Sequence, residues 1–571
     1  MQYWRGDFAH PRLSMSASTK LALLAVLLCA LSATDVSADK KTVCTITVNS
    51  PDEKELFRRN LPQDEFQFVE LVERGRPDWL ASACRAGVRC DLLVISGHFD
   101  AGTEFYTDRL DAREYLPVDE MERVACSDSC PGLFSQLKEV YLFGCNTLNA
   151  EAMRSTSAEI GRSLVRSGHS PADAERLSRM LNDRHGESNR DRMRDVFKDV
   201  PVIYGFSSKA PLGRTAGPML ERYFQSGPGG EIGSGRVNAK LLGVFAPTSM
   251  TVTAGTSDSD PRAGFRRDVC HFSDDRLSPA QKLGFVHELL NREMAEVRMF
   301  FDHIERYSAS LGDAERVAPS VSAALDGIAQ DRSARSRYLE FARDADDPAV
   351  RARMIDVARG LGWLSPAEQR TEIMRMFSER VASNSVGSAD VDLACSLNKD
   401  RALGADLHRL HLSPAQAAKV ANAAMLACLG SAEGHARVLG ALTSPSDEDV
   451  QIAQIYLRHR PLADANELRV VALGITRMSG SDAQVRALDT LARQPLSDPE
   501  SLHELTRLFP VAKSVNVQRA IAGILIRADY QAIANPELVR SLRQHRLKSP
   551  DGEDMIDVLI RRLQSALTQR T

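Results

Sequence analysis

Two short stretches decide the expected fold, Asp91-Leu-Leu-Val-Ile-Ser-Gly-His98 and Glu139-Val-Tyr-Leu-Phe-Gly-Cys145. Each is a short apolar run that ends in a small residue and then in a side chain able to do chemistry. Runs of this length and composition are typical of buried strands in a parallel sheet. Because α/β sheets bind their ligands at the carboxyl ends of the strands, we expect His98 and Cys145 to meet at one sheet edge if the strands are neighbours.

Strands and helices alternate on both sides of these stretches. Strands separated by helices predict a parallel α/β sheet, and we place this domain at 39–260. The segment 253–261 has the Gly, Ser, Thr and Asp content of a loop and marks the boundary. The other expected elements are strands at 42–48, 66–71, 201–206 and within 241–252, a loop or small hairpin at 99–111, and helices at 77–86, 150–165 and 171–197.

From about residue 277 onward the pattern changes to helix after helix. A weak internal repeat is visible here. Val450, Val485 and Val517 each lie near an expected helix start and are followed by apolar residues at helical spacing. These valines are 35 and 32 residues apart. This repeat predicts an all-α domain at 275–571 built as a paired-helix solenoid of the HEAT-like kind. An irregular helical bundle is the alternative.

The N-terminus is typical of an export signal. A lysine precedes the unbroken apolar run Leu21–Leu31, and Val36-Ser37-Ala38 offers small residues for cleavage. A start at Met15 would place residues 1–14 upstream of the true protein. The run is too short to span a bilayer comfortably, so we expect no stable membrane span. We predict that 1–38 is a cleaved signal peptide and that the protein is periplasmic or secreted; an uncleaved anchor or an ordinary buried helix is the alternative.

The cysteine count supports an exported protein with one thiol left over. Ten cysteines less Cys29 of the signal leave nine, an odd number. In an oxidising compartment the others tend to pair as disulfide bonds, and we expect Cys145 to be the unpaired one. The connectivity stays open. Cys84 lies close to Cys90 and Cys126 to Cys130, Cys395 and Cys428 share one helical region, and Cys44 and Cys270 lie at the ends of the first domain; zinc at Cys84, Cys90, Cys126 and Cys130 is a weaker alternative.

Composition argues against several functional classes. The net charge of −4 favours neither nucleic acid nor an acidic membrane surface. The arginine-rich helices of the C-terminal half lack the interleaved aromatic residues of single-strand binders. No P-loop, H-E-x-x-H or G-x-S-x-G motif occurs. We therefore expect no cofactor, no bound metal and no nucleic-acid partner.

The two opening stretches, taken as a pair, resemble the clan of caspase-like cysteine peptidases. In that clan one strand ends with His, usually followed by Gly, and a later strand ends with the nucleophilic Cys. His98 and Cys145 are 47 residues apart, near the caspase-type spacing of about 50. The clan's His-Gly pair is His98-Phe99 in this sequence, with Gly97 on the other side. The resemblance covers residues 42–250 and implies a caspase-like parallel-sheet domain.

The resemblance also implies catalytic roles. Cys145 would attack a peptide carbonyl as a thiolate, and His98 would transfer the proton. The backbone N–H groups of Cys145 and Phe99 would hold the oxyanion. Gly144 and Gly97 would allow tight turns beside the nucleophile and the histidine. A bulky Phe99 in place of glycine is expected to narrow access for the substrate.

The resemblance places the substrate cleft after the strand at 201–206. Ser207 and Ser208 would line this cleft. Asp100 and Glu104 would make it acidic and favour a basic residue before the cut.

The first interpretation is an exported caspase-like cysteine endopeptidase that acts on a protein or peptide substrate, with a helical domain that binds a substrate or protein partner. The second is a non-catalytic exported scaffold, a pseudo-peptidase whose helical repeats bind a protein partner. A third is acyl transfer by the same dyad to an acceptor other than water. The state of Cys145 separates the first two, since chemistry needs a free, activated thiol.

Overall fold

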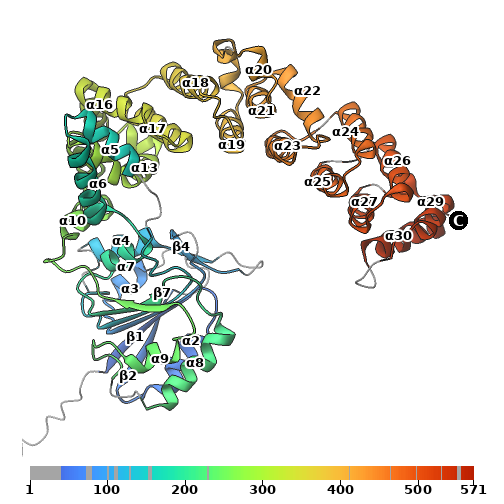
Figure 1. Cartoon of the computed structure of the whole chain (residues 1–571). Helices are drawn as coiled ribbons and strands as arrows, with labels where there is room; N and C mark the ends of the chain where they lie inside the picture. The colour runs from blue at the N-terminus through green and yellow to red at the C-terminus, as the bar shows by residue number, and fades with distance from the viewer. Residues whose placement is uncertain are drawn as a thin grey trace, which may run out of the picture. The chain divides into compact units, whose positions relative to one another are not determined.

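The computed structural model describes residues 40–72, 80–99, 102–108, 114–127, 130, 132–151, 157–227, 231–410, 412–462, 464–494, 496, 498–528, 530–548 and 554–570. The described chain forms two compact units, the first from the parts before residue 156 together with 182–278, the second from 156–181 together with 279–571. The first unit holds the sheet and the second is all helical, as the colours of Figure 1 show. The expected α/β region followed by an all-α region is confirmed at this level. The signal peptide expected at 1–38 lies outside the described residues.

The first unit is built on a six-stranded sheet in the order β2-β1-β3-β6-β7-β8. Five strands are parallel, and β8 pairs antiparallel to β7 at one edge. The two opening stretches of the sequence supply β3 and β6, which are direct neighbours. The strands are β1 (Lys41–Thr47), β2 (Phe66–Val72), β3 (Leu92–Ser96), β6 (Glu139–Phe143), β7 (Val202–Phe206) and β8 (Met250–Thr253), and a separate hairpin joins β4 (Glu104–Tyr106) to β5 (Tyr115–Pro117).

Both faces of the sheet are covered by helices, so β3 and β6 are buried along their whole length and mainly apolar, with Ser96 and Glu139 as buried polar residues. Alternate residues of β3 enter different cores: Leu93 and Ile95 lie in one, Leu92 and Val94 in the other. This is the expected pattern for a parallel sheet buried on both sides. One face carries α3 (Ala81–Arg85), α4 (Val118–Cys126) and α7 (Asn189–Val196), and the other carries α2 (Asp52–Asn60), α8 (Gly213–Gln225) and α9 (Ala239–Val244) (Figure 1).

The edge strand is shorter than the sequence suggested. Residues 241–244 of the apolar run belong to helix α9, and only 250–253 pair as a strand. The side chain of Asn238 starts the helix by accepting hydrogen bonds from the N–H groups of Lys240 and Leu241, at 3.0 and 3.1 Å. An asparagine cap of this kind competes successfully with the β-propensity of the following residues.

Four disulfides tie the structure together, and each joins cysteines that are distant in sequence: Cys44–Cys90, Cys84–Cys130, Cys126–Cys270 and Cys395–Cys428. Cys145 is the one unbridged cysteine of the described chain, as expected. The zinc alternative is wrong, because all four cysteines it needed are bridged. Four disulfides indicate an oxidising environment outside the cytosol. Over the described residues no helix is long and apolar enough to cross a membrane, and no cluster of potential metal ligands was found.

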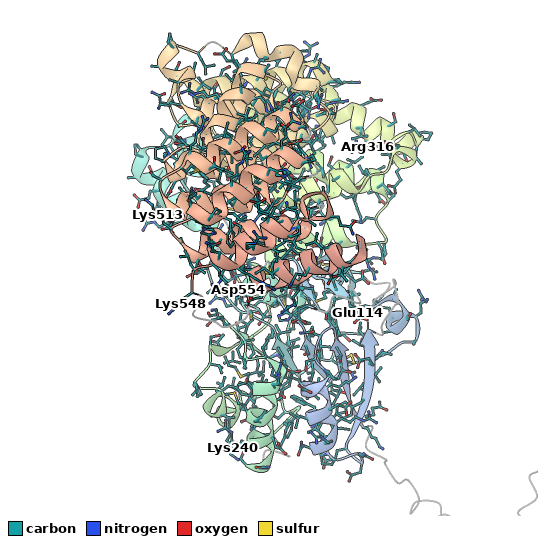
Figure 2. All side chains as sticks on the ribbon, turned by 90° about the vertical axis from the view of Figure 1, so that its right-hand side faces the viewer. Glu114, Lys240, Arg316, Lys513, Lys548 and Asp554 are labelled. Carbon is teal, nitrogen blue, oxygen red and sulfur yellow. A yellow bond between two sulfur atoms is a disulfide. The ribbon has the colours of Figure 1, made fainter. Side chains whose placement is uncertain are left out.

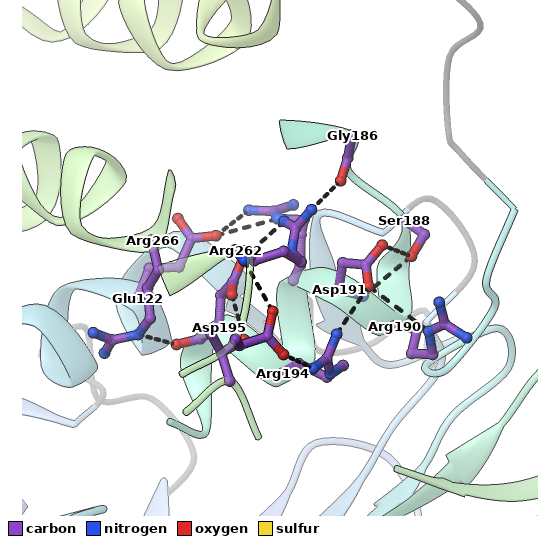
Figure 3. Close-up of polar contacts among 12 residues, drawn as sticks. Glu122, Gly186, Ser188, Arg190, Asp191, Arg194, Asp195, Arg262 and Arg266 are labelled. Carbon is purple, nitrogen blue, oxygen red and sulfur yellow. Dashed lines mark hydrogen bonds and ion pairs between the residues drawn. The ribbon is translucent and has the colours of Figure 1, made fainter. Parts of the chain in front are cut away.

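An ionic network fixes α7 against the loop that leaves β8 (Figure 3). The Asp195 carboxylate accepts hydrogen bonds from Thr256 at 2.6 Å and from Arg262 at 2.9 Å. Burial raises the pKa of Asp195, although the Arg262 guanidinium opposes this shift. Arg194 pairs with Asp260 of the same loop. These bonds satisfy charges that burial would otherwise leave uncompensated.

Two helices encoded inside the α/β region belong to the helical unit. In α5 (Ser157–Arg166) and α6 (Pro171–His185), the apolar residues Ile160, Leu164 and Ala174 form one core with Ala295 of α12 (Met294–Met299). The sequence interpretation placed these helices in the 39–260 domain. An amphipathic pattern identifies the face that a helix buries, but not the partner that covers it.

The C-terminal helices pack as two staggered rows. In one row α23 contacts α25, which contacts α27, and in the other α24 contacts α26. The three helices of the first row begin at Asp447, Ser481 and Val515, so 34 residues separate each start from the next. The repeated valines Val450, Val485 and Val517 therefore lie on successive helices of one row. The rows include α23 (Asp447–His459), α24 (Ala465–Arg477), α25 (Ser481–Leu491), α26 (Pro499–Leu508) and α27 (Val515–Arg527).

Charged side chains of both signs lie along this array, as Lys513, Lys548 and Asp554 illustrate (Figure 2). The remaining α-helices of the described residues are α10 (Ala263–Ser273), α11 (Pro279–Leu290), α13 (Phe301–Ser310), α14 (Asp313–Arg316), α15 (Pro319–Gln330), α16 (Arg332–Arg343), α17 (Pro348–Gly360), α18 (Pro366–Ala382), α19 (Ser388–Leu397), α20 (Pro414–Ala417), α21 (Val420–Cys428), α22 (Ala432–Ala441), α28 (Tyr530–Ile533), α29 (Pro536–Gln544) and α30 (Met555–Arg570).

Asp331 gives the helical unit a pH-dependent stability. Its carboxylate caps α16 by accepting the Ala334 N–H at 2.9 Å and also contacts the His287 ring at 3.0 Å. The capping N–H and the imidazole lower the pKa of Asp331 to about 2. Because the folded-state pKa is depressed, this stabilisation is complete above about pH 4 and is lost as the pH falls towards about 2.

We expect Asp331→Ala to lower the free energy of unfolding of the helical unit by about 1–2 kcal/mol at neutral pH. The measurement is urea unfolding of wild type and variant at about pH 7 and about pH 3, where the difference between them should shrink. Asp326→Ala, at an exposed position of α15, is the matched control and should change little. An equal difference in unfolding free energy between wild type and variant at both pH values would contradict the role of Asp331 in the pH-dependent stability.

Candidate active site

The structure brings His98 and Cys145 to one edge of the sheet. Ser96 and Phe143 are in register in neighbouring parallel strands, and His98 and Cys145 each lie two residues beyond them. Both line a cavity of 40 Å³ at the carboxyl ends of these strands. The other lining residues come from the ends of β1, β3 and β6 and from the segments leading into α2 and α8: Asn49, Ser50, Glu53, Ser96, Gly97, Phe143, Gly144, Ala210, Pro211, Leu212 and Gly213.

The turn that presents Cys145 is held rigidly. The Asn146 backbone has φ of 59°, in the left-handed region that asparagine tolerates better than most residues. Its N–H donates to the carbonyl of Ser208 at 2.6 Å. The buried Thr147 hydroxyl donates to the Gly144 carbonyl at 3.1 Å and accepts the Phe206 N–H at 3.0 Å. The turn after β6 is therefore fixed to the end of β7.

The Cys145 side chain is partly exposed and unbridged. Its sulfur accepts a hydrogen bond from the Ala210 N–H at 3.3 Å. Among the described residues, no hydrogen bond joins this sulfur to the His98 ring.

The His98 backbone and ring are both positioned by the β4–β5 hairpin. Its N–H and carbonyl exchange hydrogen bonds with Tyr106, each at 2.9 Å, and the two rings lie 5.4 Å apart. The His98 Nε2 atom lies 3.4 Å from Oδ2 of Asp108. Nε2 is otherwise a buried atom without a hydrogen-bond partner. Asp108 is therefore the carboxylate that faces the imidazole, a contact that the sequence interpretation did not include.

Phe99 does not project into the cavity. Its side chain is fully buried, packs on Phe105 with ring centroids 4.6 Å apart, and belongs to the core under the sheet. The expectation that this side chain narrows the substrate path is therefore not met. A bulky residue after the histidine serves the core, while its backbone stays at the sheet edge.

The remaining sequence-derived candidates occupy different places. Ser207 and Ser208 are exposed and bond to Ser249 beside β8, and neither lines the cavity. Glu104 starts β4 and is also absent from the lining. Asp100 lies outside the described residues.

Sequence reasoning missed Glu53, a carboxylate that lines the same cavity as Cys145 and His98. Glu53 lies in the first turn of α2, is 2% exposed and accepts a hydrogen bond from the Ser96 hydroxyl at 2.9 Å. Burial raises the pKa of Glu53, and hydrogen bonds from its own backbone N–H and from Ser96 counteract this only in part. Acidic residues are common in the first turn of any helix, so the sequence offered no distinctive signal for it.

Comparison with family models, with curated proteins and with solved structures found no match for this chain.

Proposed function

We propose that this protein is an exported cysteine endopeptidase of the caspase-like kind, with Cys145 as nucleophile and His98 as its proton-transfer partner. One observation carries the proposal. The unbridged cysteine of the described chain lies with a histidine in one cavity, at the ends of two neighbouring parallel strands. The disulfides of the other described cysteines favour export to the periplasm or the medium, with 1–38 as a cleaved signal.

The chemistry proposed is a two-step acyl transfer. The Cys145 sulfur forms a bond to the carbonyl carbon of the substrate, the C–N bond breaks, and His98 delivers the thiol's former proton to the departing amine. Water then hydrolyses the thioester, which releases a carboxylic acid and restores the thiol. Asp108 faces His98 Nε2 and would stabilise the imidazolium during this cycle.

The backbone supports an oxyanion site beside the nucleophile. Neither the Cys145 N–H nor the Phe99 N–H has a hydrogen-bond acceptor among the described residues. Cys145 also lines the cavity, so its N–H is available to a developing negative charge. Phe99 is fully buried, backbone included, and is not among the residues that line the cavity.

The helical unit is proposed to bind the protein substrate or a protein partner, because paired helices stacked in rows present an extended surface. Its 34-residue spacing is shorter than the roughly 40–47 residues of HEAT repeats. The array is therefore better described as a short-repeat solenoid than as HEAT-like.

The test is the rate of Cys145 alkylation by iodoacetamide in the unreduced mature protein, across a pH series. We expect fast labelling at neutral pH in wild type and at least about tenfold slower labelling in His98→Ala, since the thiolate loses its imidazole partner. His169→Ala, at an exposed loop position of the helical unit, is the control and should match wild type.

One observation favours the scaffold alternative, namely that no hydrogen bond joins the His98 ring to the Cys145 sulfur in this structure. If Cys145 labels at the rate of an ordinary thiol regardless of His98, the peptidase proposal fails and the pseudo-peptidase interpretation replaces it. If the dyad is active, analysis of the products with and without an added amine separates hydrolysis from transfer to that amine.

A further inference from the structure

A buried carboxylate lies beside the candidate nucleophile without a cationic partner. Glu53 is 2% exposed and lines the same cavity as Cys145. The next residue, Lys54, points elsewhere, because its Nζ pairs with Glu70 Oε2 at 2.9 Å. Among the described residues, no lysine or arginine forms an ion pair with Glu53. The Glu53 carboxylate accepts a hydrogen bond from the neutral Ser96 hydroxyl, at 2.9 Å.

Such an arrangement destabilises the unliganded protein. A charged group removed from water is costly unless an opposite charge compensates it, and a hydroxyl compensates it only in part. The raised pKa of Glu53 reflects this penalty. Perturbed carboxyl groups of this kind gather at functional sites, where a ligand completes the interaction.

Glu53 is not placed to take part in proton transfer. No hydrogen bond links it to His98 or to Cys145 among the described residues. The carboxylate that faces the His98 ring is Asp108, at 3.4 Å. Glu53 is thus a group that lines the reaction cavity while standing outside the catalytic dyad, which is the position of a recognition residue.

We propose that Glu53 recognises the cationic side chain of a lysine or arginine in the substrate, and that this contact sets the preceding-residue specificity of the peptidase. The inference rests on the proposed function, because it assumes that Cys145 attacks a peptide carbonyl. The cationic head would bind the carboxylate, while its methylene stem would lie along Pro211 and Leu212 at the cavity wall. Leu212 is 61% exposed, so this wall is open to an incoming chain.

Charge decides for a cation over a neutral side chain. Within the cavity lining, Glu53 is the sole carboxylate and His98 the sole basic side chain. A charge-assisted bond in a water-poor site is about twice as strong as a neutral one. A basic side chain therefore gains binding free energy from Glu53 that a neutral side chain of the same shape does not gain. This carboxylate on α2 is a different source for the basic preference than Asp100 and Glu104, the residues expected from the sequence.

The experiment compares two fluorogenic peptides that differ only at the residue before the cut, arginine in one and citrulline in the other. Citrulline has the shape of arginine without its charge. For wild type we expect kcat/KM to be roughly 100-fold higher with arginine. In Glu53→Gln this ratio should fall to near unity, and in Glu53→Asp, which keeps the charge, it should lie between. Glu65→Gln, at an exposed position in the same unit, should keep the wild-type ratio.

The outcomes separate this inference from the proposed function. Equal cleavage of both peptides by wild type, or an arginine preference that survives in Glu53→Gln, overturns the inference and leaves the peptidase standing. The same holds if Cys145 labels in a His98-dependent manner but neither peptide is cut. If labelling shows no His98 dependence and neither peptide is cut, the proposed function fails and the inference falls with it. His98-dependent labelling of Glu53→Gln shows that this variant is folded.

Discussion

Gly144→Ala is expected to disable the candidate active site and to destabilise the α/β unit at the same time. A Cβ atom at this position would lie 2.8 Å from the Gly97 carbonyl oxygen and 2.9 Å from the Phe99 Cβ atom. The Gly97 carbonyl is fixed at the sheet edge and the Phe99 side chain is fixed in the core, so the ends of β3 and β6 must move apart. We expect a loss of about 1–3 kcal/mol in the free energy of unfolding, as for other overpacked interiors.

The same displacement separates His98 from Cys145. A shift of about 1 Å in a catalytic geometry costs roughly 100-fold in rate, so peptidase activity should fall by at least that factor. The measurements are urea unfolding of the first unit and the His98-dependent labelling of Cys145. Gly161→Ala is the matched control, since nothing lies within 4 Å of its added Cβ in α5. It should raise stability by about 0.5–1 kcal/mol. Wild-type labelling in Gly144→Ala would contradict the close fit of the two strand ends.

Removal of the Cys126–Cys270 disulfide is expected to have the largest effect on stability. The bond joins residues 144 apart and so closes one long loop that contains β6, β7 and β8. In the chain-entropy account, a loop of this length stabilises the folded state by about 5 kcal/mol. We therefore expect the double variant Cys126→Ala, Cys270→Ala to lower the unfolding free energy of the α/β unit by several kcal/mol.

The measurement is thermal unfolding followed for each unit separately, for example by near-ultraviolet circular dichroism together with limited proteolysis. The control is Cys395→Ala, Cys428→Ala, which opens a loop of 33 residues in the helical unit. The control should affect only the second unit, by roughly 4 kcal/mol. A first unit that unfolds at the wild-type temperature without Cys126–Cys270 would show that this bond is dispensable.

The two central strands, β3 and β6, were predictable from sequence because each contains a short continuous apolar run. The runs Leu92–Ile95 and Val140–Phe143 can be recognised without knowing their partners, since burial on both faces favours apolar residues at successive positions. The neighbourhood of His98 and Cys145 followed from the rule that parallel strands end at a common edge. The length of the strand after 241 was not predictable from propensity alone, because the cap at Asn238 decides it.

Contacts that depend on the folded arrangement were out of reach. The bond between Cys126 and Cys270 depends on how α4 and α10 pack, which neither helix encodes by itself. Glu53 resembles any acidic residue of a first helical turn, and only its burial beside Ser96 distinguishes it. Asp108 meets His98 because the β4–β5 hairpin folds back across the sheet edge. In each case the sequence shows which side chain is present, but it does not show which residues lie close to it in the folded protein.

The excursion of α5 and α6 into the helical unit constrains how the protein can be produced. During synthesis these helices leave the ribosome more than a hundred residues before α12, which supplies Ala295 to their core. Until then Ile160 and Leu164 have no complete partner and are exposed to aggregation or to chaperones. A shortened protein that stops at residue 278 would keep this exposure permanently. Expression of the α/β unit alone therefore calls for a loop that replaces 156–181, and such a replacement should convert an aggregating fragment into a soluble one.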